Sequence, residues 1–138
     1  MNAITVTTTD SLRVDVSNGT QTMIIDEPVE AGGTGLGLKP TESVLAALGA
    51  CSAITLKLYA GRKQWPLTNV RVQVEAQPPE KGNKDAPWRF VQTLELEGDL
   101  DEEQRARLIQ IAGRCPVHKM LAGNIEFEER EATSEASA

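Results

Sequence analysis

Alternation of apolar and polar residues marks the first part of the chain as β-structure. From Ile4 to Asp26, apolar or β-branched residues recur at every second position, as a strand with one buried face requires. Asn18-Gly19 interrupts the pattern, and this dipeptide favours a two-residue hairpin turn because both positions need a positive φ. We therefore predict a meander or pair of hairpins over residues 4–26.

The apolar period changes after Pro40. From there to about Lys63, apolar residues recur every three or four positions, with several alanines between them. Arg62 and Lys63 lie at the carboxyl end of this segment, where the helix dipole favours cations. The segment predicts a helix from about Thr41 to Lys63. Few charged residues interrupt its middle, so more than one of its faces should be covered.

A glycine-rich segment, residues 27–40, precedes this helix. Its spacing, G-G-x-G-x-G, lacks the strand-turn-helix context of a dinucleotide site, so a phosphate-binding role is not favoured. We interpret the segment as a flexible loop that covers a pocket.

Shorter elements should follow the long helix. Trp65-Pro66 should end it, because the residue before a proline avoids helical backbone. Five further elements are then expected. They are a strand of alternating valines at 70–74, a strand at 89–97, a helix at Asp101–Arg114, a short helix at Pro116–Leu121 and a last strand at Ile125–Phe127.

Length and composition bound the class of protein. A chain of 138 residues with 40% hydrophobic residues can form one α+β domain with its own core. We assign that domain to residues 1–131 and expect the polar tail, 132–138, to be disordered. The net charge of −6 and the lack of a Lys/Arg cluster in the sequence argue against a nucleic-acid partner.

The expected compartment is the cytoplasm. The first ten residues lack the basic and apolar regions of a signal peptide, and unbroken apolar runs are too short to span a bilayer. Cytoplasmic buffers keep thiols reduced, so two cysteines there are either inert packing residues or a working pair.

Cys51 falls in the middle of the predicted helix, and Cys115 follows 64 positions later at a helix break. Of the two, Cys115 has the more activating neighbours, because Arg114 precedes it and His118 follows. Cys115 and His118 also have a ligand-like spacing, but a structural zinc site wants four ligands and no fourth stands out. We expect neither a metal nor an organic cofactor.

Two motifs resemble the OsmC/Ohr family, the osmotically inducible and organic hydroperoxide resistance proteins. The run PTESVLAALGAC, Pro40–Cys51, is similar to the family's central-helix motif. The run RCPVH, Arg114–His118, is similar to its distal Cys-Pro motif. The resemblance extends over roughly residues 10–130 and is specific because both motifs occur in this order and at this separation.

The resemblance implies a fold and a mechanism. Family members are intertwined α+β homodimers with two long central helices back to back and a strongly curved antiparallel sheet on each side. Cys51 would attack a hydroperoxide and become a sulfenic acid, and Cys115 would condense with it to a disulfide. A small dithiol or a thioredoxin-like donor would then reduce both.

Family peroxidases also use an arginine that lowers the thiol pKa and a glutamate that holds this arginine. Arg13 and Glu42 are the candidates, although Glu42 lies one position after the family's glutamate, where Thr41 stands here. We expect an apolar substrate pocket, because apolar residues are available to line it and nothing strongly basic is expected there to select a charged substrate. Its lining should include Val44, Leu48, Ile54 and Trp65.

The sequence thus predicts a thiol-dependent peroxidase for organic hydroperoxides that serves oxidative stress defence. Two alternatives remain open. One is a non-enzymatic relative that keeps the dimer and binds a small apolar molecule, its cysteines serving only as packing residues. The other is a redox sensor whose disulfide alters a partner surface.

Overall fold

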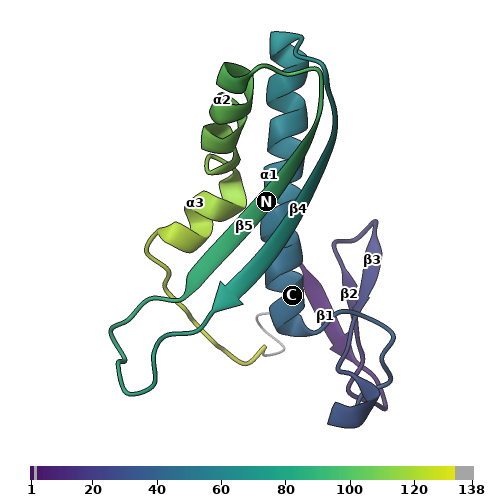
Figure 1. The fold of residues 1–138 in the computed structure, drawn as a ribbon. Helices are drawn as coiled ribbons and strands as arrows, with labels where there is room; N and C mark the ends of the chain where they lie inside the picture. Colours follow the sequence, from purple (N-terminus) through teal and green to yellow (C-terminus); the bar gives the residue numbers. More distant parts are fainter. Residues whose placement is uncertain (2, 133–138) are drawn as a thin grey trace.

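The long helix α1, Pro40–Lys63, is the axis of the molecule (Figure 1). The computed structural model describes Met1 and residues 3–132. Lys39 is the N-cap of α1, and Pro40 at the first helical position has a φ suited to a helix start. The Glu42 carboxylate accepts a hydrogen bond from the Lys39 amide at 2.9 Å. The helix ends at Gln64, whose φ of 58° lies in the left-handed region.

An antiparallel hairpin packs along one side of α1. Its strands are β4, Leu67–Gln77, and β5, Arg89–Gly98. A Cβ atom on Gly49 of α1 would lie only 2.9 Å from Cγ2 of Val74 on β4. Glycine at this position therefore allows the helix and the strand to approach closely.

Two shorter helices pack on another side of α1. These are α2, Glu102–Ala112, and α3, Pro116–Ala122. The Asp101 side chain caps α2 by accepting a hydrogen bond from the Gln104 amide at 2.7 Å. Leu56 of α1 and Leu108 of α2 are fully buried between them. We call α1, β4, β5, α2 and α3 together the helical body.

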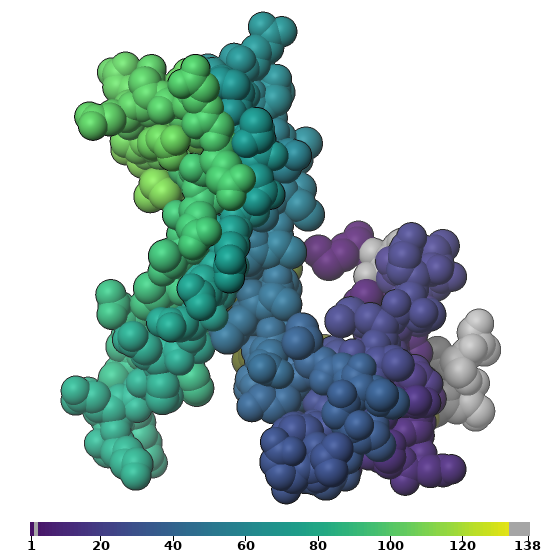
Figure 2. Space-filling model, turned by 45° about the vertical axis from the view of Figure 1, so that its right-hand side comes forward, coloured from purple at the N-terminus to yellow at the C-terminus, as the bar shows by residue number. Residues whose placement is uncertain are grey.

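A second, smaller sheet lies beside the lower half of α1 in Figure 1 and protrudes from the helical body in Figure 2. It is an antiparallel meander of β1, Thr5–Thr8, β2, Val14–Ser17, and β3, Thr22–Ile25. Its apolar side chains are mostly uncovered, and Ile4, Val6 and Met23 are 60%, 58% and 49% exposed.

The glycine-rich segment after β3 is organised by one buried carboxylate. Asp26 accepts hydrogen bonds from the amides of Glu27, Thr34 and Leu36, and from the Thr34 hydroxyl. These donors, led by the Thr34 hydroxyl, hold the pKa of Asp26 at about 2, although burial acts in the opposite direction. The segment, which includes the short 3₁₀ helix η1, Val29–Ala31, is therefore more ordered than the flexible loop expected from its composition.

The α+β class and the long central helix are confirmed. The antiparallel strands form two separate sheets, β1-β2-β3 and β4-β5, where one curved sheet was expected. The last predicted strand is wrong: Ile125–Phe127 has no regular structure, because no strand in the described part of the chain pairs with it. The expected disordered tail, 132–138, lies outside the described residues except for Ala132.

By length and composition alone, α1 could cross a membrane, which the short apolar runs of the sequence did not indicate. The central helix of a soluble protein has the same properties, and α1 here packs against β4, α2 and α3.

Candidate functional site

The fold brings the two cysteines together. Cys51 lies on α1, and Cys115 is the N-cap of α3, at the junction between α2 and α3. Both are free thiols; Cys115 is fully buried and Cys51 is partly exposed. The Cys51 and Cys115 side chains lie close enough for one thiol to influence the ionisation of the other. Two neighbouring thiols can be joined by a disulfide when an oxidant is present.

The first turn of α3 faces both sulfurs. The His118 amide donates to Sγ of Cys115 at 3.2 Å, and the Val117 amide interacts with the Cys51 thiol. The buried Ser52 hydroxyl lies 3.3 Å from the Ala112 carbonyl oxygen and 4.0 Å from Sγ of Cys115. Polar groups thus surround the pair on the side of α2 and α3.

Within one chain, the environment of Cys51 favours the neutral thiol. Burial raises the pKa of Cys51, and the neighbouring Cys115 raises it further. The Val117 amide and the Thr55 side chain act in the opposite direction, but they do not outweigh burial. A nearby cation would be needed to lower this pKa.

Arg13 does not approach Cys51 in the same chain. It lies immediately before β2, in the small sheet, which does not pack on α1 around Cys51. Its Nε atom is 3.7 Å from Oδ1 of Asp15 and is otherwise buried without a hydrogen bond. The guanidinium therefore has only a weak partner of its own.

Glu42 is also remote from the thiols. It precedes Cys51 by nine residues, roughly 14 Å along the helix axis at 1.5 Å per residue. Its carboxylate is engaged at the helix start, where it accepts the Lys39 amide.

The four predicted lining residues do not converge on one pocket. Leu48 is only 2% exposed, whereas Val44 and Ile54 are 44% and 61% exposed on the outer side of α1. Trp65 lies beyond the end of α1, where its ring packs edge-on against Tyr59 with centroids 5.5 Å apart.

An uncovered apolar stripe runs along α1 and includes Cys51. Its members recur at alternating intervals of three and four residues, the spacing of a helix–helix seam: Val44, Ala47, Cys51, Ile54 and Leu58. We call this set the α1 seam. Val44, Ile54 and Leu58 are 44%, 61% and 61% exposed, so in the single chain most of the α1 seam is uncovered, whereas Cys51 itself is partly buried at the start of α3.

Two cavities lie on either side of the thiol pair along α1. The first, of about 460 Å³, is largely apolar and includes Leu48, Trp88, Phe90, His118 and Leu121 in its wall. The second, of about 380 Å³, is lined by six residues of α1, α2 and the α2–α3 junction: Thr55, Tyr59, Arg62, Lys63, Ile111 and Arg114.

These cavities contain residues that the sequence did not single out as lining residues. The basic wall of the second cavity differs from the apolar surroundings expected. A signal was available on α1, because Thr55, Tyr59 and Lys63 follow Cys51 at intervals of four residues and so share one side of the helix. Arg114, in contrast, comes to this side only through the packing of α2.

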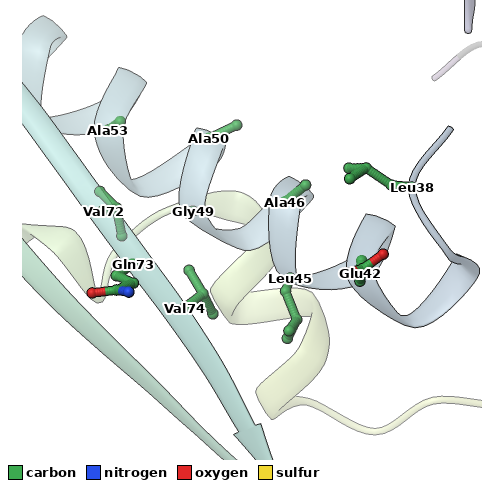
Figure 3. A pocket seen from close by; sticks show the side chains of 10 residues that line it. All are labelled: Leu38, Glu42, Leu45, Ala46, Gly49, Ala50, Ala53, Val72, Gln73 and Val74. Carbon is green, nitrogen blue, oxygen red and sulfur yellow. The ribbon is translucent and has the colours of Figure 1, made fainter.

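A third hollow, of about 520 Å³, lies between α1 and β4 (Figure 3). The side chains of Ala46, Ala50 and Ala53 border it on α1, and Val72 and Val74 border it on β4. Ala53 is about 200° around the helix from Cys51, so this groove and the thiols occupy opposite sides of α1.

Comparison with known proteins identifies relatives of this fold. The family model described as OsmC-like protein matches residues 33–130. No curated protein matches the sequence. Similar solved structures include an OsmC-like protein of Mycoplasma pneumoniae, at 20% identity and a TM-score of 0.74, covering 89% of this chain and 88% of that one.

Two further structures carry more specific names. The organic hydroperoxide resistance protein OhrB of Bacillus subtilis is 24% identical with a TM-score of 0.60, over 90% of this chain and 92% of that one. A putative organic hydroperoxide resistance protein of Vibrio cholerae, with captopril bound in one active site, is 21% identical with a TM-score of 0.59, over 91% and 88%. At these identities the structures show a shared fold.

Proposed function

This chain belongs to the OsmC-like protein family, and we propose that it is a thiol-dependent peroxidase that reduces organic hydroperoxides in the cytoplasm. The observation that carries the proposal is the proximity of Cys51 and Cys115, two free thiols contributed by elements distant in the sequence. The hydroperoxide resistance proteins among the structures of the same fold support this class of substrate.

The proposed cycle uses both sulfurs. The Cys51 thiolate attacks the terminal oxygen of a hydroperoxide, the O–O bond breaks, and the alkoxide takes up a proton and leaves as an alcohol. The resulting sulfenic acid condenses with the Cys115 thiol, forming the disulfide and releasing water. A dithiol or thioredoxin-like donor reduces the disulfide and becomes oxidised itself.

A second copy of the chain would supply what the single chain lacks. The exposed α1 seam can pack against the same seam of another chain, which would bury Cys51 at a twofold interface. The uncovered small sheet could then carry Arg13 of the partner subunit toward Cys51. The weakly paired Arg13 guanidinium suits this role, because a cation near the thiol would lower its raised pKa.

The test is stoichiometric oxidation of the reduced protein by cumene hydroperoxide. Wild type should consume about one peroxide per chain and lose both free thiols, because the second cysteine traps the sulfenic acid as a disulfide. Cys51→Ser should consume none. Cys115→Ser should consume one peroxide to form the sulfenic acid and then a second peroxide as this is oxidised to sulfinic acid, which mass spectrometry detects.

Arg13→Gln tests the activation step. It should slow the oxidation of Cys51 at neutral pH and shift the pH dependence of the rate to higher pH, since the thiolate loses a stabilising charge. Arg71→Gln, on the exposed side of β4, is the matched control. If Cys51→Ser consumed peroxide as fast as wild type, the peroxidase would be excluded and the binding-protein alternative favoured.

A further inference from the structure

The basic cavity beside the thiols is the feature that the proposed peroxidase cycle leaves unexplained. Its wall carries three cations, Arg62 and Lys63 from the last turn of α1 and Arg114 from the α2–α3 junction. Tyr59 also lines this cavity, and a fourth cation, Arg107, contacts it: the Arg107 Nε donates to the Tyr59 hydroxyl oxygen at 3.2 Å. Three positive charges, those of Lys63, Arg107 and Arg114, thus act on the Tyr59 side chain, and Arg62 adds a fourth to the wall of the cavity.

These cations have no anionic partner. Among the described residues the only ion pair joins Arg13 to Asp15, in the small sheet. The chain carries 20 acidic and 14 basic residues, so a cluster of four basic side chains without a carboxylate is contrary to its overall balance. Like charges gathered at one cavity repel each other, and an anion bound among them would relieve this repulsion.

The surroundings of Tyr59 show that the electrostatic potential in the cavity is positive. Lys63 Nζ and Arg107 Cζ lie 5.8 Å and 5.9 Å from the centroid of its ring. The Arg107 hydrogen bond, with contributions from Lys63 and Arg114, lowers the pKa of the Tyr59 phenol. The cavity therefore favours negative charge at the position of the phenol oxygen.

The rest of the wall suits a carbon chain. The side chain of Ile111 is buried, and the ring of Tyr59 adds a second apolar surface. An organic anion would match both parts, whereas an inorganic anion would leave the apolar part unused. The cavity volume of about 380 Å³ admits a small acid and not a macromolecular segment.

The position of the cavity links it to the reactive sulfurs. Thr55 lines it and lies one helical turn after Cys51, with whose thiol its side chain interacts. Arg114 directly precedes Cys115 in the chain. A molecule anchored here would extend its other end along α1 toward the pair of thiols.

We propose that this cavity is a subsite for the carboxylate of a small organic molecule that reacts at Cys51 or at the Cys51–Cys115 disulfide. The inference rests on the proposed function. Two reactants could carry the carboxylate, a hydroperoxide substrate in the oxidation step or a thiol reductant in the reduction step. The cavity would bind the carboxylate of either reactant in the same way. Measuring the oxidation and the reduction half-reactions separately shows which of the two reactants uses it.

The kinetic experiment compares an acid with its methyl ester in each half-reaction. An alkyl hydroperoxide bearing a terminal carboxylate should oxidise the reduced protein faster than its ester, or a mercapto acid should reduce the disulfide faster than its ester. Lys63→Gln and Arg114→Gln should each reduce the acid-to-ester ratio by about three- to tenfold, the range expected for the net contribution of one ordinary hydrogen bond. Lys57→Gln, an exposed lysine of the same helix outside the cavity, should leave the ratio unchanged.

A binding experiment keeps the subsite testable if turnover is absent. Calorimetry on Cys51→Ser should detect octanoate binding that exceeds methyl octanoate binding and weakens in Cys51→Ser/Lys63→Gln. Equal binding of acid and ester, or acid-to-ester ratios near one in both half-reactions, would overturn the subsite. Failure of all hydroperoxides to react, with octanoate bound selectively, would overturn the peroxidase and leave the subsite standing.

Discussion

The helical body and the small N-terminal sheet differ in how far they bury their apolar side chains. The body closes on itself, and Leu56, Leu108 and Cys115 are fully buried at the contacts of α1 with α2 and α3. The sheet buries only Val16 among its apolar strand residues, while Val6 and Met23 remain largely exposed. The two regions belong to one chain, yet only one of them forms a core within that chain.

This contrast indicates which surfaces a second chain would cover in the proposed dimer. A three-stranded sheet with exposed apolar side chains is marginal alone, because burial against another surface supplies most of the stability of a small sheet. The α1 seam is exposed as well, so the sheet and the seam are the two surfaces for which burial is still missing.

The largest effect is expected in the core of the body. Leu56→Ala should lower the free energy of unfolding by roughly 2–5 kcal/mol, since it leaves a cavity at a fully buried position. Urea unfolding followed by tryptophan fluorescence measures it. Met23→Ala should cost less than about 1 kcal/mol, and any larger cost should grow with protein concentration. Equal, concentration-independent costs would refute the contrast.

A substitution in the α1 seam should affect the stability of the single chain less, but it should strongly affect dimer formation. Leu58→Glu should convert a dimer of 14.9 kDa chains into monomers, because a charge on the seam opposes its burial. Light scattering on the eluted protein distinguishes the two masses. Lys57→Glu lies beside the seam and should remain dimeric. A monomeric wild type at micromolar concentration would disprove the interface.

The smallest effect is expected in the loop after β3, from acid. The folded pKa of Asp26 is about 2, below the usual 3.8, so its hydrogen bonds stabilise the fold above about pH 4. This contribution should be lost as the pH falls from about 4 toward 2. Urea midpoints of wild type and Asp26→Asn should therefore differ at pH 5 and converge near pH 2. A constant difference across this range would exclude the carboxylate as the cause.

The sequence was sufficient where local pattern or motif decides the structure. The helical period after Pro40 predicted α1 to its last residue, Lys63. Asn18-Gly19 correctly predicted a turn between β2 and β3, but the two-residue form was wrong: the connection spans residues 18–21, and only Gly19 of the pair has a positive φ. The proximity of Cys51 and Cys115 followed only from the resemblance of their two motifs, because nothing local relates residues 64 positions apart. Tertiary contacts then placed them together.

Features that depend on packing between distant segments could not be predicted. The basic cavity joins Thr55 to Arg114, and no periodic pattern relates these two positions. The strand expected at Ile125–Phe127 had a suitable composition, but a strand also needs a neighbour, and composition does not supply one. The roles of Arg13 and Glu42 depended on an arrangement of chains that a single sequence does not contain.

The close approach of α1 to β4 at Gly49 has a consequence for which part of the protein would move during the proposed disulfide cycle. Gly49 lies two residues before Cys51, and its contact with Val74 leaves no room for α1 to slide or rotate against the strand. Cys115, in contrast, begins a helix of only seven residues. Formation and opening of a disulfide should therefore be accommodated by displacement of α3, with α1 as the fixed support. The opening step, and with it the rate of recycling, would then depend on the mobility of a single short helix.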